Sequence, residues 1–321
     1  MNDNVKKAAV IGAGMIGLSM CALLTGNGVE TYLYVRNRQK ERKEKYSEIF
    51  AGLVEDGLIE EEQKESCVSY LHIISSYEEL KDVDIAFECV AETLEVKQEV
   101  YENLRRSCPK LLVAASTSSA ISSRELAIVS GMADKVLVAH PFYPPHLIPC
   151  VEVVPNEYTS MESMRVLMDF LKSLNREVVV LKKDAPGFVA NRVQYAMLRE
   201  AINIVEQGIA DPEDVDKVLK YSFIPRYTSI GIFEHFDNCG LDLAKDISNY
   251  LFPDLCNDIH VQKLLDEKCA EGNYGVKSGR GIYFWDKKSL MDLEQRVKVP
   301  YLNFVSWNIP ERACEGKEDE N

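Results

Sequence analysis

His140 and Glu152 are the pair of side chains in this sequence best suited to move a proton. His140 ends the apolar run Val136–Ala139, and Glu152 lies twelve residues further on, within Cys150–Val154. An imidazole has an unperturbed pKa near neutral pH, and a neighbouring carboxylate can fix its tautomer and stabilise its protonated form. We therefore predict that His140 is a general base and that Glu152 orients it. The alternative, a core histidine at the end of a strand, stays open at this point.

A glycine-rich turn near the start of the chain predicts a dinucleotide site. It follows the apolar run Ala8–Ile11 and contains Gly12, Gly14, Met15, Ile16 and Gly17. Gly12 permits a tight turn, Gly14 lets the backbone approach a pyrophosphate, and Gly17 lets the next helix pack closely on the sheet. The amides at the helix N-terminus, from Gly14 through Met15 and Ile16, would bind the phosphates. A chance glycine turn is the weaker interpretation, because a strand precedes the motif and a helix follows it.

The end of the second predicted strand, Glu30–Val35, differs from a typical NAD site. Such a site places Asp or Glu there to hold the adenosine ribose, whereas this chain has Arg36, Arg38 and Lys40. A guanidinium group matches the oxygens of a 2′-phosphate two at a time. The cofactor is therefore predicted to be NAD or NADP, with NADP slightly favoured by Arg36 and Arg38. In the alternative, Arg36 stacks on adenine and the other cations are solvated.

The segments that position these residues alternate between strand-like and helix-like patterns. The predicted strands are Ala8–Gly12, Glu30–Val35, Ile85–Glu88, Leu111–Ala115, Val136–His140, Cys150–Val154 and Glu177–Leu181. They are short and rich in Val, Ile and Leu, which predicts an α/β fold with a Rossmann-type doubly wound sheet.

No strand pattern follows the turn Asp184–Gly187. A helix predicted from Phe188 to about Gly208 begins an all-helical C-terminal domain that continues to about Tyr283. We therefore predict a dinucleotide-binding domain over residues 1–184, a helical substrate and dimerisation domain over 185–285, and a C-terminal extension over 286–321.

Composition excludes several classes of protein. Among 321 residues, 37 are basic and 51 acidic, and the net charge of −14 argues against a nucleic-acid partner. Nine cysteines without a Cys-x-x-Cys pair predict neither a disulfide framework nor a zinc site, and a reducing cytoplasm fits them best.

Glu234-His235-Phe236-Asp237 has no supporting partner for a metal site, so we predict none. The apolar segment Ala8–Leu24 is better explained as strand–turn–helix than as a signal peptide or membrane span.

Six motifs in order resemble those of the 3-hydroxyacyl-CoA dehydrogenase family over about Lys7 to Tyr283. They are Gly12–Gly17, Phe87–Glu92 with Lys97, Ser116–Ser119, the His140 segment with Val151–Val154, Pro186–Arg192 and Lys277–Tyr283. Each motif alone is weak evidence, but six of them in register make a strong match.

The resemblance implies a role for each of these residues. His140 would take the proton of a substrate hydroxyl as hydride leaves the same carbon for the nicotinamide. Glu152 would bind the other ring nitrogen, and Ser118 and Asn191 would hydrogen-bond the reacting oxygen. Glu92 and Lys97 would contact the nicotinamide ribose. The resemblance also implies a homodimer formed through the helical domain, and the histidines other than His140 are interpreted as structural.

The substrate is less well defined by the sequence. Acyl-CoA enzymes of this family usually have Asn three residues after the catalytic histidine, where this chain has Tyr143, although a phenol could replace the amide as donor. The segment Ala139–Pro149 is more similar to the free-acid branch, that of L-gulonate 3-dehydrogenase (λ-crystallin) and carnitine 3-dehydrogenase. Arg226 could then anchor a substrate carboxylate, and a surface arginine that caps a helix is an equally good interpretation.

Gly231-Ile232-Phe233-Glu234 points the other way, because it resembles the Gly-Pro-Phe-Glu of the acyl-CoA enzymes. We predict an NAD(P)-dependent enzyme that interconverts a 3-hydroxy and a 3-oxo group, with a free 3-hydroxy acid slightly favoured over a CoA thioester as its small-molecule substrate. The alternative from another class is a non-catalytic NAD(P)-binding sensor or a crystallin-like protein.

Overall fold

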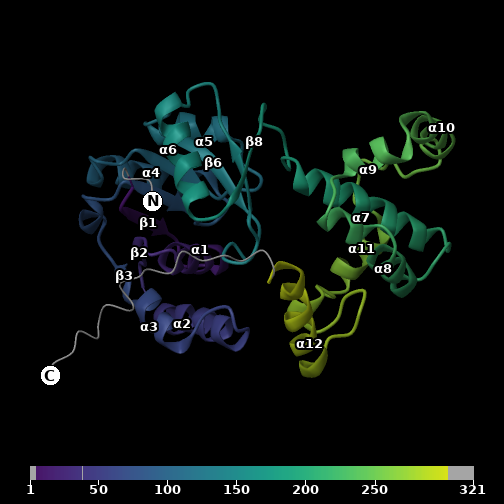
Figure 1. Cartoon of the computed structure of the whole chain (residues 1–321), viewed down its shortest axis with the longest axis horizontal. Helices are drawn as coiled ribbons and strands as arrows, with labels where there is room; N and C mark the ends of the chain where they lie inside the picture. The colour runs from purple at the N-terminus through teal and green to yellow at the C-terminus, as the bar shows by residue number, and fades with distance from the viewer. Residues whose placement is uncertain (1–4, 38, 303–321) are drawn as a thin grey trace. The chain divides into compact units, whose positions relative to one another are not determined.

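The computed structural model describes residues 5–37 and 39–302. The described residues form two compact units, of which the first contains those between Val5 and Val189 together with those from Val297 to Leu302. The second unit runs from Ala190 to Arg296. Figure 1 draws the first unit mainly from purple to teal and the second from green to yellow.

The first unit contains one eight-stranded sheet with the order β3-β2-β1-β4-β5-β6-β7-β8. The strands are β1 Lys7–Ile11, β2 Glu30–Tyr34, β3 Leu71–Ile74, β4 Ile85–Glu88, β5 Val113–Ser116, β6 Val136–Pro141, β7 Cys150–Val154 and β8 Glu177–Val180. The sequence order reverses between β1 and β4, and in such sheets a ligand binds at the carboxyl ends of the strands beside that reversal. The predicted α/β class with a Rossmann-type sheet is confirmed.

Helices cover both faces of this sheet. They are α1 Met15–Gly26, α2 Gln39–Glu55, α3 Glu61–Ser69, α4 Leu94–Ser107, α5 Ser123–Ser130 and α6 Met161–Ser173, with the short helix η1 Tyr77–Leu80. Ala8 and Val10 of β1 belong to one core cluster, and Ala9 and Ile11 belong to the other. Alternate residues of a strand point to opposite faces, so a strand that is covered on both sides must be apolar at every position. This double coverage explains the continuous apolar runs in the sequence.

One strand of the sheet was not predicted, and another has a direction that the sequence analysis left open. Strand β3 was not predicted, because it has only four residues and His72 interrupts its apolar pattern. Strand β7 runs antiparallel to β6, whereas the other neighbouring strands are parallel. The short loop between β6 and β7 contains no crossover helix, and a parallel connection needs one. The loop includes a cis bond between Tyr143 and Pro144.

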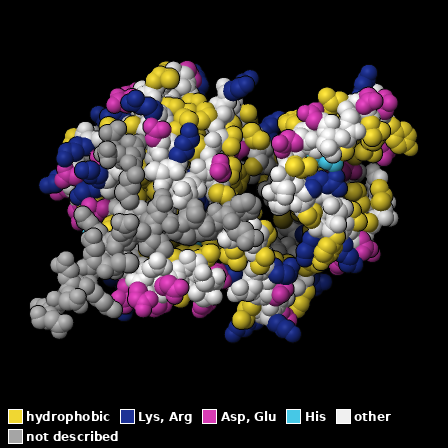
Figure 2. Space-filling model, viewed as in Figure 1, with side chains coloured by type: hydrophobic (Ala, Val, Ile, Leu, Met, Phe, Trp, Pro, Cys, Tyr) yellow, Lys and Arg dark blue, Asp and Glu magenta, His cyan; other side chains and the backbone are white. Residues whose placement is uncertain are grey.

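The second unit is helical, and no strand occurs among its described residues. Its elements are α7 Ala190–Glu206, α8 Pro212–Tyr221, η2 Ile224–Thr228, α9 Ile232–Cys239, α10 Leu241–Leu251, α11 Lys263–Ala270, η3 Val276–Ser278 and α12 Lys287–Lys298, which is followed by η4 Val299–Tyr301. Ile202 is the one fully buried hydrophobic side chain within residues 190–296. Figure 2 accordingly shows many exposed hydrophobic side chains over this unit.

The last two residues of α12 and the described residues after them belong to the first unit. Lys298 Nζ lies 2.5 Å from Asp56 Oδ1, and Tyr301 packs against the core cluster that contains Val10. Over the part of the chain that is described, no helix has both the length and the apolar composition needed to cross a membrane.

Candidate active site

His140 and Glu152 face one another across the antiparallel pair β6 and β7. The strand register places the two residues directly opposite, which brings side chains on one face of a sheet into contact. His140 Nδ1 lies 2.9 Å from Glu152 Oε2, and both side chains are buried. A carboxylate accepts hydrogen bonds, so this contact favours the tautomer with the proton on Nδ1, in which Nε2 is free of a proton and can act as an acceptor.

The second oxygen of Glu152 fixes the turn that leads into α7. The backbone N–H of Val189 donates to Glu152 Oε1 at 2.9 Å. This turn uses left-handed backbone at Gly187 (φ 75°) and Phe188 (φ 49°), a conformation that glycine adopts without steric cost. The buried Phe188 ring also packs on the His140 ring, with 5.3 Å between the ring centres. Glu152 therefore holds both the imidazole and the chain that continues to Asn191.

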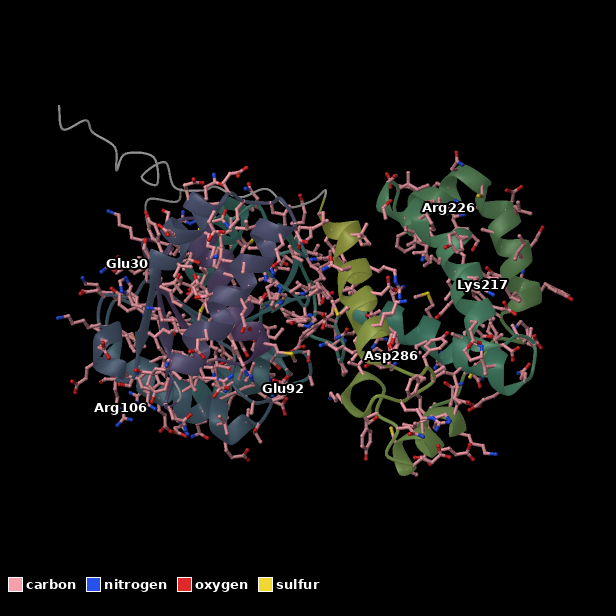
Figure 3. All side chains as sticks on the ribbon, turned by 90° about the horizontal axis from the view of Figure 1, so that it is seen from below. Glu30, Glu92, Arg106, Lys217, Arg226 and Asp286 are labelled. Atoms are coloured by element: carbon pink, nitrogen blue, oxygen red, sulfur yellow. The ribbon has the colours of Figure 1, made fainter. Side chains whose placement is uncertain are left out.

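Glu92 collects hydrogen bonds from the loop after β5. The Ser118 hydroxyl donates to Glu92 Oε1 at 2.5 Å, and the amides of Ser119 and Ala120 donate to the same oxygen at 3.0 Å. Figure 3 labels Glu92 at the surface of the first unit. Burial acts to raise the pKa of the Glu92 carboxyl, but the Ser118 hydroxyl, Lys97 and the Ala120 amide outweigh it and hold that pKa below its ordinary value. Glu92 is therefore a carboxylate that ties the segment after β4 to the loop that carries Ser118.

Lys97 is buried in the ion-pair network behind Glu92. Its ammonium lies 2.8 Å from Glu88 Oε1 and 3.1 Å from Glu92 Oε2, and Lys97 is 1% exposed. Glu88 also accepts from Ser116 Oγ at 2.6 Å. The network joins the ends of β4 and β5 to α4. The predicted contacts of Glu92 and Lys97 with a ribose, and of Ser118 with a substrate oxygen, stay predictions.

The glycine turn between β1 and α1 is shaped for a ligand that approaches the backbone. A Cβ atom at Gly12 (φ 112°) would lie 2.5 Å from the Cys89 carbonyl oxygen, and one at Gly17 would lie 1.8 Å from the Gly12 carbonyl oxygen. A Cβ at Gly14 would meet no atom within 4 Å. Gly12 and Gly17 are therefore required by close packing, whereas Gly14 borders open space. Met15 is 73% exposed at the start of α1.

A pocket of about 360 Å³ lies beside this turn. Its lining includes Gly12 and Gly14, residues 34–37 after β2, Arg42 of α2, and Val96 and Val100 of α4. The pocket combines bare backbone, apolar walls and cationic side chains, as a dinucleotide requires, so the chain's own residues fit such a cofactor.

Arg36 and Arg42 supply the described positive charges of this pocket. Arg36 Nη2 lies 2.7 Å from Glu99 Oε1. The sequence analysis considered only the cations directly after β2 and missed Arg42. Its position in the first turn of the next helix, α2, could have indicated that it lies near the same site. Arg38 lies outside the described residues.

The other predicted substrate contacts lie on separate elements. Tyr143 is 56% exposed in the loop after β6, and Asn191 is the second residue of α7. Arg226 lies in η2 of the helical unit (Figure 3), where its Nη1 is 3.1 Å from His235 Nε2. Asn191 and Arg226 belong to the second unit, and their contact with a substrate held at His140 stays a prediction.

His146 has a structural environment. It is buried, and its Nδ1 lies 2.6 Å from Ser19 Oγ. Burial, together with the positive charge of the neighbouring Arg176, lowers the pKa of His146 to about 4. Arg176 is itself buried and donates to the carbonyl oxygens of Pro145 and Ile148. These contacts hold the loop that follows His140.

Comparison with known families decides the identity of the fold. The NAD binding domain of 3-hydroxyacyl-CoA dehydrogenase matches residues 7–185, and the C-terminal domain of the same enzyme matches residues 187–285. The chain belongs to the 3-hydroxyacyl-CoA dehydrogenase family. It is therefore an oxidoreductase of a family that carries an NAD-binding domain, and the family resemblance seen in the sequence is confirmed.

Relatives within the 3-hydroxyacyl-CoA dehydrogenase family differ in the substrates for which they are named. A 5-formyl-3-hydroxy-2-methylpyridine 4-carboxylate 5-dehydrogenase of Mesorhizobium japonicum is 30% identical, over 90% of this chain and 94% of the relative. An L-carnitine dehydrogenase of Oceanobacillus iheyensis is 35% identical over 74% and 76%. A probable 3-hydroxybutyryl-CoA dehydrogenase of Bacillus subtilis is 29% identical over 89% and 99%.

A solved structure supports the same assignment over nearly the whole chain. The crystal structure of a 5-formyl-3-hydroxy-2-methylpyridine 4-carboxylic acid 5-dehydrogenase, described as an NAD+ dependent dismutase, superposes with a TM-score of 0.84 at 27% identity. The match covers 98% of this chain and 100% of that one.

Proposed function

We propose that this chain is an NAD(P)-dependent dehydrogenase that interconverts a 3-hydroxy and a 3-oxo group, with a free 3-hydroxy acid as its preferred substrate. The observation that carries the proposal is the buried His140–Glu152 pair, whose strands hold the imidazole with Nδ1 engaged and Nε2 as the acceptor. A bound nicotinamide would accept the hydride. A protein that only senses NAD(P) has no need for this pair.

The residues of the chain would divide the reaction as follows. His140 Nε2 would take the hydroxyl proton, and Glu152 would stabilise the imidazolium that forms. Ser118 and Asn191 would hydrogen-bond the reacting oxygen. Glu92, held as a carboxylate by Ser118 and Lys97, would position Ser118 and face the ribose.

The preference for a free acid rests on Tyr143 and Arg226. Tyr143 occupies the place of the asparagine that is usual in acyl-CoA enzymes, and Arg226 offers a guanidinium group that a substrate carboxylate can bind. Two of the three relatives above are named for acids without a CoA group. The relative named for a CoA thioester and the segment Gly231–Glu234 favour a 3-hydroxyacyl-CoA as the second candidate.

Steady-state assays with a small panel of substrates test this preference. The panel contains 3-hydroxybutyrate, carnitine, L-gulonate and 3-hydroxybutyryl-CoA, each supplied with NAD+ and with NADP+. We expect the largest kcat/KM with a free acid. Arg226→Met should raise KM for that acid by about ten- to a hundredfold, because a bidentate charged contact is lost. Lys217→Met, an exposed cation of the same unit, is the control. Higher kcat/KM with the CoA thioester, and no effect of Arg226→Met, would reject the free-acid assignment.

We further propose that NADP(H) is favoured over NAD(H). Residues 35–40, directly after β2, contain no carboxylate, while Arg36 and Arg42 line the pocket beside it, and guanidinium groups suit a 2′-phosphate. The family's NAD binding domain supports NAD(H) as the broader class of cofactor. The ratio of kcat/KM for NADPH to that for NADH, measured at low ionic strength, decides the preference, and a strong preference for NADH would reject it.

A homodimer formed through the helical unit completes the proposal. Exposed hydrophobic side chains gather on α9 and α10, including Phe233 at 85% and Tyr250 at 87% exposure. A unit with one buried hydrophobic side chain lacks a sufficient core of its own, and a second copy could cover this face. Sedimentation velocity should give the mass of a dimer, and a monomer at micromolar concentration would contradict it.

A further inference from the structure

Arg36 and Glu99 form an ion pair that joins two walls of the cofactor pocket. Arg36 lines the pocket directly after β2. Glu99 lies on α4 between Val96 and Val100, both of which also line the pocket. The pair is 2.7 Å long, and the two side chains are 62% and 55% exposed. The bridge therefore spans the solvent side of the pocket.

Two aromatic side chains line the pocket together with Arg36. Tyr34 and Tyr77 line the same pocket, and their ring centres are 4.3 Å apart. The hydrogen bond that Arg36 donates to the Glu99 carboxylate raises the pKa of the Arg36 guanidinium above its ordinary value. The Glu99 carboxylate is thus placed to compete with an anionic ligand for Arg36.

We propose that Glu99 is a positioning residue that sets the cofactor preference by competing with the 2′-phosphate for Arg36. The proposal rests on the proposed function, because it concerns a nicotinamide dinucleotide bound in this pocket. With NADP(H), the phosphate must take Arg36 away from Glu99 or share it. With NAD(H), no phosphate is present and the bridge stays closed. Glu99 therefore lowers the affinity for NADP(H) and leaves that for NAD(H) nearly unchanged.

The exposure of the pair makes this competition reversible. An ion pair between exposed side chains is weak, worth a few-fold in an equilibrium constant, so a phosphate with nearly two negative charges can displace the single carboxylate. Arg42 lines the same pocket and would keep part of the phosphate affinity. Removal of Glu99 should consequently shift the preference without creating or abolishing it.

Titration of the purified protein with NADPH and NADH, followed by nucleotide fluorescence, tests the proposal without requiring turnover. Glu99→Gln should lower the Kd for NADPH by about three- to fivefold and change the Kd for NADH by less than about twofold. The shift should shrink in high salt, because exposed charges are screened. Glu102→Gln, one turn further along α4 and also exposed, is the matched control and should change neither constant.

A second variant tests whether Glu99 acts through Arg36. In an Arg36→Leu background, the gain in NADPH affinity from Glu99→Gln should fall to about twofold or less. An equal gain in both backgrounds, or no gain in either, would overturn the proposal. Absence of turnover with every substrate would reject the proposed dehydrogenase function, and the binding constants would still decide the role of Glu99.

Discussion

Replacing Glu152 with glutamine removes one negative charge from the buried pair and keeps the side chain at nearly the same size. The glutamine oxygen can still accept from the Val189 N–H, which lies 2.9 Å from the native carboxylate. Its NH2 group then faces His140 Nδ1 and donates to it. The imidazole must therefore carry its proton on Nε2, which is the atom that has to accept the substrate proton.

The loss of activity can be estimated from the geometry. His140 Nδ1 and Glu152 Oε2 are 2.9 Å apart in a buried site. At an effective dielectric constant of about 20, the attraction between a carboxylate and the imidazolium formed during the reaction is on the order of 5 kcal/mol. Allowing for the cost of dehydrating the charges, we expect Glu152→Gln to lower kcat by about 10²- to 10⁴-fold.

The measurement is steady-state oxidation of the best substrate in the panel, combined with thermal unfolding and cofactor binding. Because the hydrogen bond to Val189 is retained, the free energy of unfolding should change by only about 1–2 kcal/mol, and the affinity for the cofactor should be unchanged. Glu157→Gln, which alters an exposed carboxylate just after β7, is the control. A folded Glu152→Gln enzyme with kcat within about threefold of the wild type would refute the assignment of this pair as base and orienter.

Three further changes have defined expected outcomes. The pKa of His146 is 6.5 in the unfolded chain and about 4 in the native state, so the free energy of unfolding should fall as the pH drops between these values, by about 2 kcal/mol at pH 5. His146→Gln should reduce this loss. The same pH dependence of the unfolding free energy in the variant and the wild type would contradict the prediction. Ser118→Ala should lower kcat/KM by about ten- to a hundredfold, because it removes the hydroxyl held by Glu92. Ser119→Ala, which keeps the backbone amide contact with Glu92, should not. Equal kcat/KM for the two variants would exclude a role for the Ser118 hydroxyl. Ile247→Asp on α10, at a side chain 53% exposed, should shift the sedimentation coefficient toward that of a monomer, and an unchanged dimer would place the interface elsewhere.

Local pattern was sufficient for most of the first unit. Seven of its strands were predicted within two residues of their observed ends, because strands buried on both faces must be apolar throughout. The glycine turn was predicted because its spacing follows from backbone geometry alone. The short edge strand β3 was not, since half-exposed strands of four residues leave little pattern.

Contacts between distant segments were decided by the tertiary structure. The family resemblance implied only that Glu92 and Lys97 contact the nicotinamide ribose, and the packing shows that Lys97 is buried between Glu88 and Glu92. The pattern of cations after β2 gave no sign of the bridge from Arg36 to Glu99, because Glu99 is 63 positions away on another element.

The chain's own order of residues determined which chemical groups are available: an imidazole, a carboxylate and a glycine turn, each at the end of a predictable element. Only the fold decided that His140 and Glu152 meet. They meet because β7 returns antiparallel to β6 in one particular register, and a slip of one residue would turn the carboxylate to the opposite face of the sheet. Such a register depends on the packing of both faces at once, which no local stretch of sequence encodes.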